Sequence, residues 1–328
     1  MDGIESNTTL PVLPEAVHPI LDELKIGQSL GASRYIRRIN DLFCAIAEHW
    51  GTDRGQELIR CLLATGDYFI EIRGRNTPAV SNAIHLVLKG LGQYSSSNVA
   101  AIREFISTRR TEYNTQSIRN IDLIATYGAN LFANRKAILA FDYSSTMMAI
   151  LKKLADWGHH KYLIVTEGRD MVGGQPIVQE ATDFGHTVNF VLDMAFHHFL
   201  PEVDAVLAGA ETLFANGDCW NTVGSLPIAV VSNYYNVPFY VTTELIKIDA
   251  RSFQGIRKPI KPVDYSDLFD YPASFKHPEL VSVSAPNLDN VPGNLISGYI
   301  TERGVLLPAN IYAETLNFLG SIGVMPLL

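Results

Sequence analysis

Cysteine, positive charge and long apolar runs are all scarce in this sequence of 328 residues. The cysteines, Cys44, Cys61 and Cys219, are far apart and match no metal-ligand spacing, which predicts reduced thiols in a cytoplasmic protein and no metal site. The formal net charge of −8 argues against a protein that binds nucleic acid or a membrane surface. No run of about twenty apolar residues is present, so we expect no membrane-spanning helix.

Composition and periodicity predict an α/β protein of two domains. The chain is 47% hydrophobic and 18% charged, as is usual for globular proteins. Residues 1–14 have no apolar core and are interpreted as a flexible arm, not a signal peptide. Residues 15–127 carry apolar side chains at helical spacing, which predicts an N-terminal helical domain. Residues 128–328 alternate strand and helix patterns, which predicts a doubly wound, Rossmann-like parallel sheet.

Short apolar runs bounded by polar residues mark the expected strands of this sheet. They are Ala137–Phe141, Tyr162–Thr166, Val188–Leu192, Ala205–Ala208 and Phe239–Thr242, with a last strand after about Leu295. Val99–Phe132 is expected to form one long helix, or two with a break. No G-x-G-x-x-G motif follows the first strand, so neither a dinucleotide nor another cofactor is predicted.

The stretch Ala205–Ser225 is interpreted as a buried strand that runs into a loop of small and polar residues. Open α/β sheets bind their ligands at the carboxyl ends of the strands, where such loops lie. The candidate site residues of this loop are Glu211, Asn216, Asp218 and Asn221. The alternative is that its glycines only form turns and its polar residues are solvated.

A second candidate site lies in the helical part of the sequence. Arg73, Gly74 and Arg75 come just before a helix that is expected to begin near Pro78, capped by Asn76 or Thr77. The N-terminus of a helix attracts anions, so these residues are predicted to bind phosphate. The alternative is a capped loop with solvated arginines.

Polar side chains also follow the other expected strands. They are Asp142, Ser144, Ser145, Arg169 and Asp193. Two carboxylates at neighbouring strand ends can divide the roles of acid and base. Arg169 and the helix N-terminus at Ser144–Thr146 can hold a phosphate. Together they indicate proton transfer on a small phosphorylated molecule. The alternative is that Asp142 and Asp193 are helix N-caps.

Several motifs resemble those of one family, which contains the α, β and δ subunits of initiation factor 2B, ribose-1,5-bisphosphate isomerase and methylthioribose-1-phosphate isomerase. The motifs are Gly209-Ala-Glu, Asn236-Val-Pro-Phe-Tyr-Val, Val291-Pro-Gly-Asn-Leu-Ile, Ile72-Arg-Gly and Thr166-Glu-Gly-Arg. The region from Leu280 to Tyr312 most resembles the β subunit. The resemblance implies a helical domain followed by a Rossmann-like domain.

The sequence departs from this family at the positions that carry its chemistry. The isomerases have a Cys where this chain has Asp142, an Asp where it has Glu211, and a phosphate-contacting Lys where it has Thr222. The resemblance therefore implies a divergent phosphosugar aldose–ketose isomerase, in which Asp142 carries the proton at C2 and Glu211 moves protons between the oxygens. Its alternative is a non-catalytic regulatory subunit that binds a sugar phosphate or a nucleotide and acts through partner chains.

The resemblance also implies a homodimer through the sheet domain. Large apolar side chains near the loop Asn216–Ser225 give independent support, because interface cores are enriched in aromatic residues. They are Phe196, Phe199, Leu200, Phe214, Trp220, Tyr234 and Tyr235. The alternative is that these side chains fill the core of a single chain.

Overall fold

Two compact units divide the chain in the computed structural model, which describes residues 9–26, 31–95, 98–169, 173–260, 262–268 and 274–323. The helical unit comprises the described residues up to Arg119, together with Ile246–Ala250 and the described residues from Leu316 onward. The sheet unit comprises the described residues of Asn120–Leu245 and Arg251–Thr315. Most of the arm that was expected over residues 1–14 lies outside the described residues.

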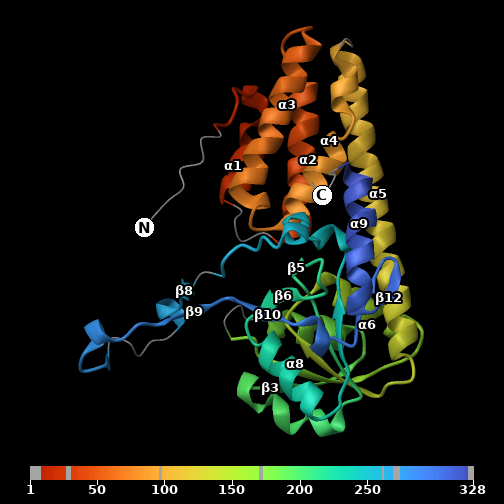
Figure 1. The fold of residues 1–328 in the computed structure, drawn as a ribbon, viewed down its shortest axis with the longest axis vertical. Helices are drawn as coiled ribbons and strands as arrows, with labels where there is room; N and C mark the ends of the chain where they lie inside the picture. Colours follow the sequence, from red (N-terminus) through yellow and green to blue (C-terminus); the bar gives the residue numbers. More distant parts are fainter. Residues whose placement is uncertain are drawn as a thin grey trace. The chain divides into compact units, whose positions relative to one another are not determined.

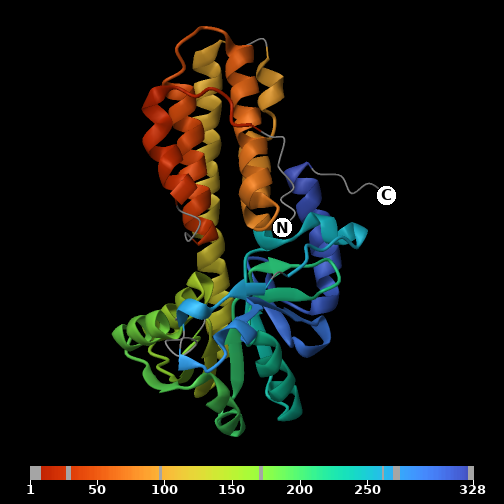
Figure 2. The ribbon, with the colours of Figure 1, turned by 90° about the vertical axis from the view of Figure 1, so that its left-hand side faces the viewer.

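Amphipathic helices that run alongside one another build the helical unit (Figure 2). They are α1 (His18–Ile26), α2 (Ala32–Glu48), α3 (Gly55–Phe69), α4 (Pro78–Leu88) and the first part of α5 (Val99–Phe132). In α2, the side chains of Ile36, Ile39, Phe43 and Ile46 recur at helical spacing and are all buried in one core. The segment expected to form one or two helices is the single helix α5.

A seven-stranded sheet forms the centre of the sheet unit (Figure 1). Its strands, in spatial order, are β12 (Gly304–Leu306), β11 (Gly298–Thr301), β7 (Phe239–Thr242), β4 (Ala205–Ala208), β1 (Ala137–Phe141), β2 (Tyr162–Thr166) and β3 (Thr187–Val191). All neighbours are parallel except the edge strand β12, which pairs antiparallel with β11. The predicted fold class, helices followed by a mostly parallel Rossmann-like sheet, is confirmed.

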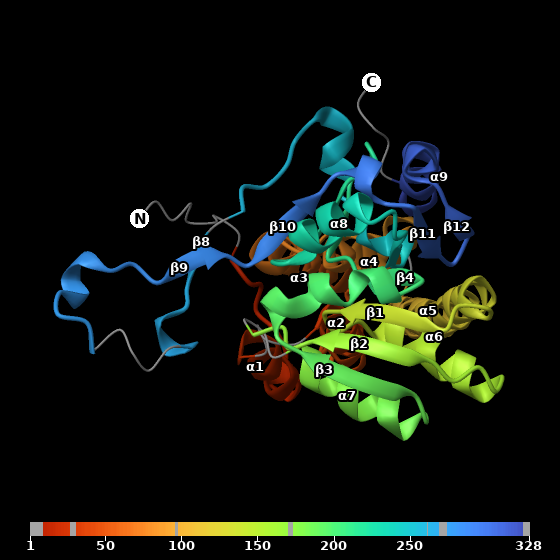
Figure 3. The same ribbon diagram turned by 90° about the horizontal axis from the view of Figure 1, so that it is seen from below.

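Helices cover both faces of this sheet, as a doubly wound fold requires (Figure 3). The helices that follow β1, β2 and β6 are α6 (Ser145–Asp156), α7 (Gly174–Asp183) and α8 (Ser225–Tyr234). Ile138 and Ala140 of β1 share one apolar core with α6, α7 and the end of α5. Phe141 faces the opposite side and contacts Gly224, directly before α8.

Smaller strands were not predicted. The strands β10 (Leu288–Val291), β6 (Cys219–Thr222) and β5 (Thr212–Leu213) form a three-stranded antiparallel sheet. The strands β8 (Pro262–Asp264) and β9 (Ser284–Pro286) pair with each other and extend away from the larger sheet (Figure 3). Other short elements are η3 (Ile70–Gly74), η5 (Asp193–His198), η6 (Leu200–Glu202), η8 (Ala250–Gln254) and η12 (Gly293–Leu295), followed by α9 (Ile311–Ile322).

The apolar side chains that were expected at a dimer interface separate into a buried and an exposed group, with the half-buried Phe199 between them. Phe196, Leu200, Phe214 and Trp220 are buried inside this chain, and the Trp220 side chain is only 3% exposed. Their assignment to an interface is therefore wrong, because the chain itself covers them. Tyr234, in contrast, is 78% exposed at the end of α8, and Tyr235 beside it is also exposed.

Candidate functional site

Asp142 lies directly after β1, at the carboxyl end of the sheet. Its backbone has a φ of 60°, in the left-handed region that Asp and Asn tolerate better than most residues. The hydroxyl of Thr222, the last residue of β6, donates a hydrogen bond of 2.6 Å to Asp142 Oδ2. Asp142 is thus not the N-cap of α6, since Ser144 occupies that position.

Three further polar or small residues gather beside it. A Cβ atom added to Gly209, just after β4, would lie 2.9 Å from Ser144 Cβ and 3.9 Å from Asn221 Oδ1. The loops after β1 and β4 and the strand β6 therefore meet at this point. Ser144 makes no side-chain capping bond to α6, whereas Asn221 Nδ2 donates to Ser225 Oγ at 2.9 Å. Ser145 is the first residue of α6 and is exposed.

Glu211 follows two residues after Gly209 and is partly buried. Its backbone N–H donates to the carbonyl oxygen of Trp220 at 2.8 Å, which fixes the start of the loop. Among the described residues, its carboxylate has no hydrogen-bond or ion-pair partner. A partly buried carboxylate without a partner is available to a ligand or to a transferred proton.

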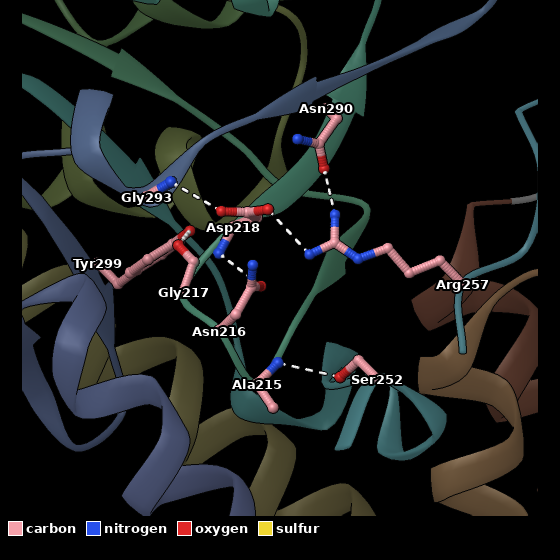
Figure 4. A network of polar contacts seen from close by, with 9 residues as sticks. All are labelled: Ala215, Asn216, Gly217, Asp218, Ser252, Arg257, Asn290, Gly293 and Tyr299. Atoms are coloured by element: carbon pink, nitrogen blue, oxygen red, sulfur yellow. Dashed lines mark hydrogen bonds and ion pairs between the residues drawn. The ribbon is translucent and has the colours of Figure 1, made fainter. Parts of the chain in front are cut away.

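Asn216 and Asp218, in contrast, belong to a network that holds their loop (Figure 4). Asp218 Oδ1 accepts a hydrogen bond of 3.0 Å from Gly293 N, and Oδ2 accepts one of 2.9 Å from Arg257 Nη2. Arg257 also donates to Asn290 at 3.0 Å. Burial alone would raise the pKa of Asp218, but its contacts with Asn216, Gly293 and Arg257 outweigh burial and lower that pKa. Contact of Asn216 and Asp218 with a ligand stays a prediction.

Arg169 and Asp193 line a cavity of about 680 Å³ on the α8 face of the sheet. Asp193 does not act as a simple cap of its own helix, because its carboxylate accepts hydrogen bonds from Gly168 N at 2.8 Å and Arg169 N at 3.0 Å. The other walls are mostly apolar and include Phe141, Phe196 and Ile228. The volume lies within the range of small-molecule pockets, about 300–1,000 Å³.

Arg73, Gly74 and Arg75 lie in the helical unit. Arg73 and Gly74 end the π-helical turn η3, and Arg75 is its C-cap, with a hydrogen bond of 2.8 Å from Arg75 N to Ile70 O. The Arg73 guanidinium lies 5.5 Å from the centre of the Tyr35 ring, and Arg75 pairs with Glu71 at 2.7 Å. Such turns often mark functional positions.

The helix expected after this turn is confirmed. It is α4, with Pro78 at its first position and Thr77 at the N-cap, although the Thr77 side chain makes no capping bond. Gly74 packs so tightly against Ser81 that an added Cβ would lie 3.0 Å from Ser81 Cβ. A side chain at position 74 would therefore require Ser81, in the first turn of α4, to shift by a few tenths of an ångström.

Sequence reasoning missed the partners that hold the candidate residues. Asp289 of β10 accepts hydrogen bonds from Gly224 N at 2.8 Å and Leu226 N at 3.0 Å, and so neutralises the N-terminus of α8. No local pattern indicates Asp289 or Arg257, because each acts across more than thirty residues of sequence. One feature of the sequence does point to the hydrogen bond between Thr222 and Asp142: both residues differ from those found at the same positions of the resembled motifs.

Neither a metal site nor a membrane span is found in the described part of the chain. Within the described ranges, His, Cys, Asp and Glu side chains form no group of three or more that is suited to a metal ion. None of the helices formed by the described residues combines the length and the apolar character that a membrane crossing requires.

Comparison with known proteins places these residues in a family. The profile of the Initiation factor 2 subunit family matches residues 29–308. This chain belongs to that family. The relationship inferred from the motifs is therefore confirmed.

The relatives of this family member include enzymes and translation factors. Ribose 1,5-bisphosphate isomerase of Archaeoglobus fulgidus is 26% identical over 94% of this chain and 96% of its own length. Methylthioribose-1-phosphate isomerase of Desulforamulus reducens is 26% identical over 74% of each chain. Translation initiation factor eIF-2B of Pyrococcus horikoshii OT3 has a similar structure, with a TM-score of 0.72 and 20% identity over 90% of this chain and 98% of its own. That structural likeness shows a shared fold.

Proposed function

We propose that this protein binds a small phosphorylated, pentose-type ligand and interconverts its aldose and ketose forms. The observation that carries the proposal is the meeting of Asp142, Ser144, Gly209 and Asn221 at the carboxyl ends of β1 and β4. This is the end of an open α/β sheet at which ligands bind. Relatives that are named as phosphosugar isomerases support the choice of ligand.

In this proposal the phosphate lies at the N-terminus of α6. The dipole of that helix favours an anion, and the Ser144 and Ser145 hydroxyls add donors. Arg169 in the sheet unit supplies further positive charge, and Asn216, Asp218 and Asn221 complete the proposed ligand contacts of this unit. Arg73, Gly74 and Arg75 in the helical unit are proposed, separately, to bind phosphate.

The proposed reaction moves only protons. The ionised Asp142 carboxylate takes the proton from C2 of the open-chain aldose, and the electron pair of that C–H bond forms the double bond of an enediol. Asp142 then returns the proton to C1, while Glu211 carries the hydroxyl proton from the C2 oxygen to the C1 oxygen. Atoms and electrons balance within the substrate. A positioned acid or base of this kind contributes a factor of about 10² to 10⁴ to the rate.

The test is conversion of a panel of pentose phosphates, followed by phosphorus NMR. We expect turnover of at least one of these substrates, and a fall of about 100-fold or more in kcat for Asp142→Asn with ligand binding retained. Asp183→Asn, an exposed aspartate at the end of α7, is the matched control and should behave as the wild type. Absence of turnover across the panel would overturn the proposal.

A regulatory subunit is the second candidate function. The observation that favours it is that the Asp218 carboxylate accepts hydrogen bonds from Gly293 and Arg257 of the same chain. This part of the candidate loop is therefore held by contacts within the chain. Similarity in fold to the initiation factor subunits supports it as well. It predicts binding of a sugar phosphate or a nucleotide without turnover, and co-purification with larger partner chains. Turnover by the isolated protein would contradict it.

We further propose a homodimer through the sheet unit. The exposed apolar side chains of η5 and α8 support this interface, because surfaces of this kind are seldom left uncovered in soluble monomers. They are Met194, Val230, Tyr234 and Tyr235. Light scattering should report about twice the chain mass of 36.3 kDa, and Tyr234→Asp should shift the protein to the monomer. A monomeric wild type would exclude the dimer.

A further inference from the structure

We propose that Thr222 is a positioning residue for Asp142: its hydroxyl fixes the orientation of the Asp142 carboxylate and keeps that carboxylate ionised. The hydrogen bond joins Thr222 Oγ1 to Asp142 Oδ2 over 2.6 Å and spans 80 residues of sequence. The inference rests on the proposed function only for its effect on turnover, because the hydrogen bond can be tested without a substrate.

The donor in this bond is the Thr222 hydroxyl, and the acceptor is an oxygen of the Asp142 side chain. A hydroxyl that donates to a carboxylate makes a charge-assisted hydrogen bond, which is about twice as strong as a bond between neutral groups. A donor that binds the ionised form of an acid stabilises that form. Asp142 must be ionised to accept a proton from carbon, so Thr222 favours the state that the reaction needs.

The backbone holds Thr222 firmly in place. In the antiparallel pairing of β6 with β10, Thr222 lies opposite Leu288. The carbonyl oxygen of Thr222 accepts a hydrogen bond of 2.8 Å from Ser225 Oγ. The next residue, Val223, donates its N–H to Asn287 O at 3.0 Å. Threonine is β-branched, so its side chain has few rotamers to choose from. The hydroxyl is therefore placed by a rigid strand and not by a mobile loop.

Asp142 is restrained from the other side as well. Its backbone lies in the left-handed region, with a φ of 60°. Gly173, before α7, lies so near that an added Cβ would be 2.8 Å from Asp142 Oδ1. The carboxylate is thus bracketed by the Thr222 hydroxyl at Oδ2 and by the backbone of Gly173 at Oδ1. A shift of about 1 Å in a reacting group can lower the rate about 100-fold. Contacts that hold the Asp142 carboxylate in place therefore matter if it carries a proton.

The experiment compares Thr222→Val and Thr222→Ala, which lack the hydroxyl, with Thr222→Ser, which keeps it. The carboxyl carbons of aspartate are isotope-labelled, and the Asp142 signal is identified by its loss in Asp142→Asn. The ligand-free protein is then titrated and followed by carbon NMR. We expect the midpoint of the titration of the Asp142 carboxyl group to rise by about one pH unit in the valine and alanine variants. In the serine variant it should stay within about 0.3 unit of the wild type. Circular dichroism confirms folding of each variant.

The outcomes separate this inference from the proposed function. An unchanged midpoint in both variants that lack the hydroxyl overturns the positioning role, whatever the turnover. A raised midpoint supports it even if no substrate is converted, a result that would contradict only the proposed function. Where a substrate is found, the acidic limb of the pH profile of kcat/KM should move upward in Thr222→Val and stay in place in Thr222→Ser. An acidic limb that does not move in Thr222→Val contradicts the role in turnover.

Discussion

The two ends of the seven-stranded sheet satisfy their polar side chains in different ways. At the amino end, Lys161 Nζ donates to the carbonyl oxygens of Ala133 and Arg135 at 2.7 Å each. His186 Nδ1 accepts a hydrogen bond of 3.0 Å from Lys161 N, and its Nε2 donates to Leu151 O at 2.9 Å. Both side chains are buried and all these partners are backbone groups. Polar groups that are satisfied in this way stabilise the fold and have little capacity left for a ligand.

At the carboxyl end, the carboxyl groups of Glu211 and Glu302 differ from this pattern. The Glu211 carboxylate has no hydrogen-bond or ion-pair partner among the described residues, and Asp142 accepts a hydrogen bond from another side chain. Burial raises the pKa of Glu302, after β11, to about 7, and the carboxylate of Glu244 adds to the rise. Perturbed and unsatisfied groups of this kind cluster at functional sites. The amino end of the sheet therefore serves stability, whereas the carboxyl end is suited to chemistry.

The largest expected effect concerns the support beneath the carboxyl end. The Trp220 ring packs edge-on against Phe214, with centres 5.1 Å apart, and Lys258 Nζ lies 5.2 Å from the centre of the Trp220 ring. Trp220→Ala removes this buried ring, so the free energy of unfolding should fall by about 4 kcal/mol in a urea titration. Ile118→Ala, at a side chain of α5 that is 71% exposed, is the control and should change the free energy of unfolding by less than about 0.5 kcal/mol. Equal losses would show that Trp220 is not a core residue.

The next effect tests the amino end. His186→Ala leaves Lys161 N and Leu151 O without their partner, so we expect a loss of about 3 kcal/mol in the free energy of unfolding. Burial lowers the pKa of His186, so the folded state binds fewer protons than the unfolded state below the ordinary value of 6.5. The contribution of His186 to stability should therefore be lost as the pH drops below about 6.5, so the difference in the free energy of unfolding between the wild type and His186→Ala should narrow there. His159→Ala, at an exposed histidine, should keep the pH dependence of the wild type.

Local patterns in the sequence predicted most of the architecture. The apolar run Ala205–Ala208 and the helical period over Val99–Phe132 both depend on neighbours along the chain, and both elements formed where expected. The antiparallel sheet of β5, β6 and β10 was missed. Its strands are two to four residues long, and β6 and β10 pair across more than sixty residues, so no local period marks them.

The candidate site was predicted in part, for the same reason. The rule that ligands bind at carboxyl ends found Asp142, Ser144 and Asn221, which the structure brings to one place. It could not show that Arg257 engages Asp218, because that pair depends on the path of a segment 39 residues further along the chain. The type of a residue determines the chemistry that its side chain can perform. Only the tertiary fold determines which other residues that side chain contacts.

A smaller effect should appear at Glu302. Its pKa is raised from 4.5 to about 7, so the folded state binds more protons than the unfolded state over this interval. The contribution of Glu302 to stability should therefore fall as the pH rises from about 4.5 to 7. Glu302→Gln keeps an acceptor for Leu245 N and removes the charge. The variant should match the wild type near pH 4.5 and exceed it by about 1–2 kcal/mol near pH 8, as measured by urea titration. A parallel pH dependence in both proteins would show that Glu302 ionises normally.

The smallest effect on stability is expected at Glu211, the residue in which the two ends of the sheet differ most. Its carboxylate makes no hydrogen bond or ion pair within the described residues, so Glu211→Gln should change the free energy of unfolding by less than about 0.5 kcal/mol. The same substitution removes the group that is proposed to carry the hydroxyl proton, so kcat should fall by about 100-fold or more with KM little changed. His186→Ala should show the reverse, with stability lost and the kcat of the folded fraction retained. If Glu211→Gln lowered stability as much as His186→Ala, the contrast between the two ends of the sheet would fail. Unfolding curves and kinetics on the same preparations decide between these outcomes.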